Sequence, residues 1–114
     1  MTQILQVPRM ILNISIEDQS YPIEVPEGIL AEGVEFFKKV DDDMDKGWQM
    51  SRSWVDRPGV EQRCQIVADK ILGAFEQENK KSLVLLSAYI LQKMTGVKTV
   101  YVSTNGEMQE TSFE

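Results

Sequence analysis

Two tryptophans and two arginines that are suited to contact another molecule lie within one short stretch of this sequence. They are Trp48, Arg52, Trp54 and Arg57. Trp and Arg are enriched at binding hot spots, because they offer a large apolar area and fixed hydrogen-bond donors. The stretch therefore predicts a surface for a protein partner. The alternative is that both indoles cover the core and both guanidinium groups pair with the aspartates just before them.

Those aspartates form the second candidate site. Three of them occupy the first three ligand positions of an EF-hand loop: Asp41, Asp43 and Asp45. The match then ends, because Lys46 stands where that loop needs Gly and Arg52 where it needs a bidentate Glu. We expect an ordinary acidic turn here, with a divalent-cation or small-molecule site in the Asp41–Asp45 cluster as the alternative function.

The remaining composition offers little for catalysis. The chain has no histidine, which is the commonest general base and a frequent metal ligand. It also has no phosphate-binding loop, nucleophile elbow or dinucleotide-binding motif. Its single cysteine, Cys64, keeps helical step with Val60 and Val67, so we expect a buried structural thiol. We expect neither enzymatic activity nor a cofactor.

Length and charge narrow the class of protein. The 114 residues fit one domain, and a net charge of −6 disfavours nucleic-acid binding. The first residues lack a signal-peptide pattern and no stretch is long and apolar enough to span a bilayer, so we expect a cytoplasmic protein without a membrane segment. Residues 1–9 are candidates for a loose extension, and 107–114 for a weak edge strand or a frayed tail.

Two alternating stretches predict a β-hairpin near the start of the chain. Their apolar positions are Leu12, Ile14 and Ile16, then Tyr21, Ile23 and Val25. We expect the turn at residues 18–20. Pro22 and Pro26 cannot donate ladder hydrogen bonds, so the second strand is expected at a sheet edge.

The hairpin and the helix entry Pro26-Glu27-Gly28 together resemble the opening of a β-grasp domain, such as a sulfur carrier or a plant-type ferredoxin. The chain departs from both families. It ends in Ser112-Phe113-Glu114 instead of Gly-Gly, and its single cysteine cannot hold an iron–sulfur cluster. The resemblance implies a shared local shape in the first third and no activity.

Three helices are expected after the hairpin, at residues 28–40, 60–75 and 82–95. The first is expected to end near Lys38-Lys39, which avoids placing aspartates at its negative end. Asp56 is expected to cap the second. Residues 41–59 show no clean period.

The third helix is apolar on every side of the helical wheel, which is typical of a buried central helix. The chain has few layers to cover this helix. Any part of it that stays uncovered becomes a subunit interface, and we therefore expect a homodimer. Val97 to Val102 predict one more strand. The expected fold class is α+β: a small antiparallel sheet, made of the hairpin and a C-terminal strand, packed against three helices with helix 82–95 central and buried.

Overall fold

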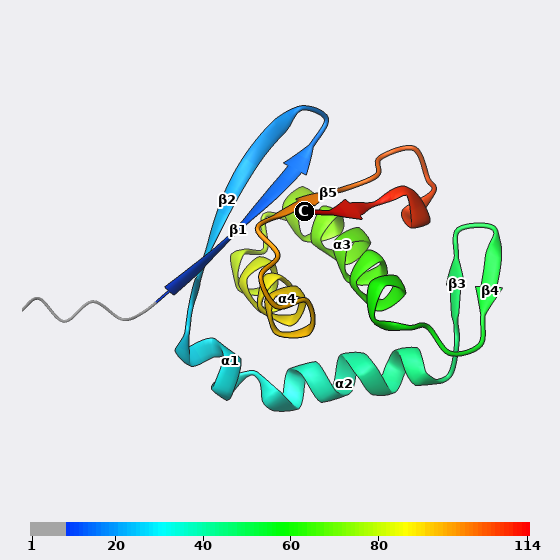
Figure 1. Cartoon of the computed structure of the whole chain (residues 1–114), viewed down its shortest axis with the longest axis horizontal. Helices are drawn as coiled ribbons and strands as arrows, with labels where there is room; N and C mark the ends of the chain where they lie inside the picture. The colour runs from blue at the N-terminus through cyan, green and yellow to red at the C-terminus, as the bar shows by residue number, and fades with distance from the viewer. Residues whose placement is uncertain (1–8) are drawn as a thin grey trace, which may run out of the picture.

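A computed structural model describes residues 9–114, so nearly all of the predicted extension 1–9 lies outside the described residues. Figure 1 shows an α+β fold in which a sheet and a pair of helices pack together, with a long helix running beneath them. The strands are β1 (Arg9–Ile16), β2 (Gln19–Pro26), β3 (Trp48–Met50), β4 (Ser53–Val55), β5 (Thr99–Tyr101) and β6 (Ser112–Phe113). The helices are α1 (Gly28–Glu32), α2 (Val34–Asp45), α3 (Val60–Glu76) and α4 (Lys80–Lys93), with a 3-10 turn at Met108–Glu110.

The predicted N-terminal hairpin is confirmed. β1 and β2 pair in antiparallel register, with Leu12 opposite Ile23 and Ile14 opposite Tyr21. The turn consists of Glu17 and Asp18, both with positive φ, so it lies one residue earlier than expected. Two positive φ values match the right-handed twist of the strands that they join. As Pro22 and Pro26 indicated, β2 lies at the edge of the sheet.

From the sequence, the C-terminal strand is expected to pair antiparallel with the hairpin, but it pairs parallel. β5 lies beside β1 and runs parallel to it, so the sheet is mixed and has the order β2-β1-β5-β6. The chain reaches β5 from α4 through a turn at Gly96, whose φ is +88°. Strand direction after such a crossover depends on how the helices pack, and side-chain alternation carries no information about it. β6 then pairs antiparallel to β5 within residues 107–114.

The predicted first helix is two helices. α1 and α2 meet at Gly33, where a Cβ atom would lie 2.8 Å from the Phe37 ring and 2.9 Å from the carbonyl oxygen of Ile29. The expectation that this helix ends near Lys38-Lys39 is wrong, because α2 continues to Asp45. Its aspartates therefore stand at the negative end of a helix, and other groups must offset that charge.

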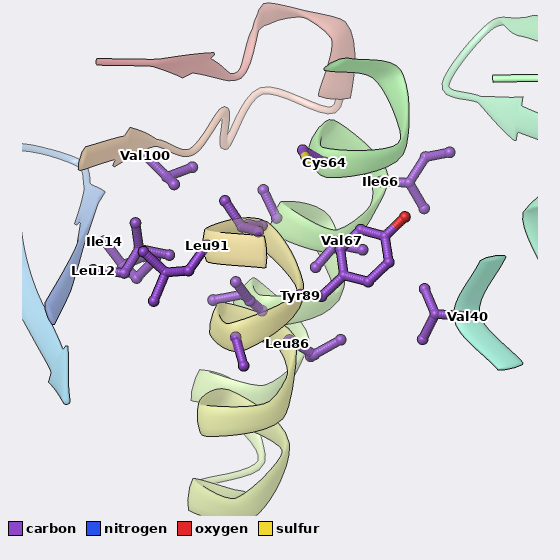
Figure 2. Close-up of a cluster of buried hydrophobic side chains, with 14 of the residues drawn as sticks. Leu12, Ile14, Val40, Cys64, Ile66, Val67, Leu86, Tyr89, Leu91 and Val100 are labelled. Atoms are coloured by element: carbon purple, nitrogen blue, oxygen red, sulfur yellow. The ribbon is translucent and has the colours of Figure 1, made fainter. Parts of the chain in front are cut away.

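α4 is the central buried helix, as its sequence predicts. Five consecutive residues, Ser87 to Leu91, are all buried. Figure 2 shows what covers them: Leu12, Ile14 and Val100 from the sheet, Cys64 and Val67 from α3, and Val40 from α2. In the described part of the chain, no helix is long and apolar enough to cross a membrane.

Candidate functional site

Residues 48–55, which have no clean period in the sequence, form a small hairpin of their own. β3 and β4 pair only with each other, in a two-stranded sheet separate from the main one. Figure 1 shows this hairpin standing beyond the helices, where α2 ends and α3 begins. Trp48 lies opposite Val55 and Gln49 opposite Trp54. Since cross-strand partners share a face and neighbours alternate, the two indoles are on opposite faces.

Trp48 is on the inner face of the hairpin. Its ring is partly buried and packs against the hydrophobic core. The ammonium group of Lys70, on α3, lies 4.8 Å from the centroid of this ring in a cation–π contact. From the sequence, the tryptophans could either form a contact surface or cover the core. Trp48 covers the core.

Trp54 is on the outer face and is 57% exposed. The indole is nevertheless held in place, because its Nε1–H donates a hydrogen bond of 2.8 Å to Oδ1 of Asp56. The ring also lies so close to the α-carbon of Gly47, whose φ is +98°, that any side chain there would overlap it. Asp56 therefore holds Trp54 and, contrary to the expectation from the sequence, does not cap α3. The residue at the cap is Gly59, whose N–H donates to Oε1 of Gln62.

The two arginines of the predicted site are exposed, Arg52 in the turn between β3 and β4 and Arg57 after β4. The Arg52 side chain is 89% exposed and its Nε lies 3.2 Å from Oε1 of Glu107. Arg57 follows β4 and is also exposed. Neither is paired with the aspartates of α2. We use the name hairpin surface for the outward group Gln49, Arg52, Trp54 and Arg57.

Two of those aspartates pair with Arg63, on α3. Its Nη1 lies 3.0 Å from Oδ1 of Asp41 and its Nη2 lies 2.6 Å from Oδ1 of Asp45. The Tyr89 hydroxyl donates to Asp41 at 2.6 Å, and Nζ of Lys93 lies 2.9 Å from the second oxygen of Asp41. These five residues, which we call the Asp41 cluster, join α2 to α3 and α4. They also offset the charge conflict at the end of α2.

The pKa directions favour a structural role for this cluster. Partial burial by itself would raise the pKa of Asp41, but hydrogen bonds from Lys93, Tyr89 and Arg63 outweigh it and hold the pKa below its usual value. Burial, together with the bond to Asp41, raises the pKa of the Tyr89 hydroxyl, which therefore stays protonated as a donor. Burial raises the pKa of the Cys64 thiol to about 12, so this thiol is not a ready nucleophile.

The lowered pKa of Asp41 has a consequence for stability in acid. A carboxyl group with a lower pKa in the folded than in the unfolded state stabilises the fold above the unfolded value, and this contribution is lost as pH falls through the folded value. The ordinary value is 3.8, so the loss is expected below about pH 4. Urea unfolding of the wild type and Asp41→Asn should show a difference in unfolding free energy that shrinks as pH falls below about 4. A difference that is independent of pH would contradict this assignment.

The structure does not gather the three candidate metal ligands. Asp41 and Asp45 are one helical turn apart and face Arg63, whereas Asp43 lines a cleft between α2 and the α3–α4 pair. Within residues 9–114, no group of three or more His, Cys, Asp or Glu side chains is placed to hold a metal ion.

No protein-family model, no curated protein and no solved structure matches this chain. Its own residues are thus the basis for any functional assignment.

Proposed function

We propose that the chain is a protein-interaction module and that its partner binds the hairpin surface. The observation that supports this most directly is the exposed but fixed indole of Trp54. A large aromatic group that is already held in one orientation loses little conformational entropy when a partner covers it. Such aromatic groups, with arginines around them, are the typical hot spots of protein interfaces.

The charge of the segment indicates what kind of partner fits. Residues 46–57 carry three cations, Lys46, Arg52 and Arg57, and one carboxylate, Asp56, in a chain whose net charge is −6. A partner that presents an apolar pocket for Trp54, with acidic groups beside it, complements this local excess of positive charge. Elsewhere, the acidic remainder of the chain would repel such a partner.

We propose a different protein, and not a second copy, as this partner. The homodimer expected from the sequence depended on an uncovered part of the central helix, and the sheet, α3 and α2 cover the central residues of α4. The mass in solution at micromolar concentration is therefore expected to be that of one chain, and a stable dimer would overturn this part. We place the interaction in the cytoplasm, which suits a chain whose only cysteine is a buried free thiol.

Capture from a lysate of the source organism tests the proposal. The immobilised wild-type chain is compared with Trp54→Ala and with Tyr101→Ala, which removes another exposed aromatic ring, on β5 of the main sheet. At least one protein is expected to be retained by the wild type and by Tyr101→Ala but lost with Trp54→Ala. Identical sets of captured proteins for all three chains would count against the hairpin surface.

A further inference from the structure

A cleft of roughly 360 Å³ separates α2 from the α3–α4 pair, on the side of α2 away from the Asp41 cluster. This volume is at the small end of the range for ligand pockets in proteins. Its apolar lining comes from all three helices: Phe36 and Val40 on α2, Ala74 on α3 and Leu86 on α4. The cleft is separate from the hairpin surface, so a ligand bound in it would be independent of the proposed function.

The charged residues that line this cleft carry a net positive charge. Lys39 on α2 and Lys70 on α3 both line it, with Asp43 as the one lining carboxylate. Among residues 9–114, the ion pairs involve other cations, and neither Lys39 nor Lys70 has a carboxylate within 4.0 Å. The Lys70 ammonium group lies 4.8 Å from the centroid of the Trp48 ring, and Lys39 stands across the cleft on α2, so two cations without a carboxylate partner flank the apolar floor. They favour an anion with an apolar body.

Gly73 supplies a second, independent indication. It lies inside α3, where glycine is unfavourable relative to alanine, and it lines the cleft. A Cβ atom added there would meet no other atom within 4 Å. Packing therefore does not require this glycine, in contrast to Gly33 and Gly47. A helix-interior glycine that keeps a cleft open at a cost in stability is the kind of local conflict found at functional sites.

We propose that this cleft binds a small organic carboxylate with an apolar body. The apolar body would lie on the floor formed by Phe36, Val40 and Leu86. The carboxylate would lie at the rim beside Lys39, and Lys70, whose ammonium group also contacts the Trp48 ring, would add a second positive charge from α3. Asp43, on the same rim, would disfavour dianions.

Titration of the full ¹⁵N-labelled chain with butanoate, hexanoate, octanoate and phenylacetate, followed by amide chemical shifts, tests this proposal. At least one of these acids is expected to shift the amides of Gly73, Gln77 and Ser82. The neutral analogue hexan-1-ol is expected to bind at least about tenfold more weakly than hexanoate. No saturable shift with any of the four acids up to about 10 mM, or equal affinity for the alcohol, would overturn the proposal.

Matched variants locate the bound group. Lys39→Gln and Lys70→Gln are each expected to weaken binding of the best acid about fivefold. Lys81→Gln, which removes an exposed charge of α4 outside the cleft, should leave the affinity unchanged. Equal affinities for all three variants would overturn the assignment of the carboxylate to this rim.

The role of Gly73 has its own readout. Gly73→Ala is expected to raise the melting temperature by about 3 °C, because alanine is the better helix former and its methyl group meets open space. Gly73→Leu should fill part of the cleft and lower the affinity for the best acid by more than about tenfold. A lower melting temperature for Gly73→Ala, or unchanged binding in a folded Gly73→Leu, would contradict the proposal.

Discussion

Replacing Asp41 with alanine is expected to lower the free energy of unfolding by about 3 kcal/mol, the lower end of the range for breaking a buried ion pair. Asp41 accepts from Tyr89 and pairs with Arg63 and Lys93, whose side chains are only 14% and 32% exposed. Without the carboxylate, Lys93 and the Tyr89 hydroxyl lose their partner while partly buried, and Arg63 keeps only Asp45 as an acidic partner. Chemical denaturation of the wild type and the variant measures the difference.

Asp43→Ala is the matched control for this experiment. It removes the same chemical group from the same helix two residues away, but Asp43 is exposed and belongs to no ion pair in the described part of the chain. A change within about 0.5 kcal/mol is expected, as for most surface substitutions. If Asp41→Ala is no more destabilising than Asp43→Ala, then the Asp41 cluster does not hold α2 in place.

Replacing each tryptophan with alanine is expected to have very different effects on the free energy of unfolding. Trp48→Ala should lower the free energy of unfolding by about 2–4 kcal/mol, because it removes a ring that packs on the core. Trp54→Ala should lower it by less than about 1 kcal/mol, since that ring is 57% exposed. Each variant serves as the control for the other. Equal losses would mean that the indoles do not occupy opposite faces of the hairpin.

The local parts of the fold could be predicted from the sequence because the pattern itself is local. Alternation at Leu12 and Ile14 indicates the first hairpin, and a helix apolar on all sides indicates the buried position of α4. The direction of β5 could not be predicted in this way. Its pairing with β1 joins Asn13 to Thr99 across most of the chain, and it depends on how the intervening helices pack.

The candidate site was predictable only in part. The composition of residues 48–57 points to a contact surface, but β3 and β4 have three residues each, which is too few for alternation to separate Trp48 from Trp54. Helical spacing could have revealed Arg63, which lies four residues before the buried Val67 and directly before the buried Cys64 of α3. A cation in that position needs a buried partner.

The cleft could not be predicted from the sequence. It exists because α2 is joined to the α3–α4 pair by core side chains near Phe37 and by the Asp41 cluster, which leaves space beside Gly73. The sequence shows Gly73 as one glycine inside a helical pattern. Only the packing around it reveals that no neighbour requires its small size.

The affinity of the captured partner for the purified variants is the most direct test of the hairpin surface. Calorimetric titration is expected to give a dissociation constant at least about 30-fold higher for Trp54→Ala than for the wild type, the effect of losing one hot-spot residue. Tyr101→Ala should bind like the wild type, and the free energy of unfolding of Trp54→Ala should stay within about 1 kcal/mol of the wild-type value. An unchanged dissociation constant for a folded Trp54→Ala would contradict the proposed function.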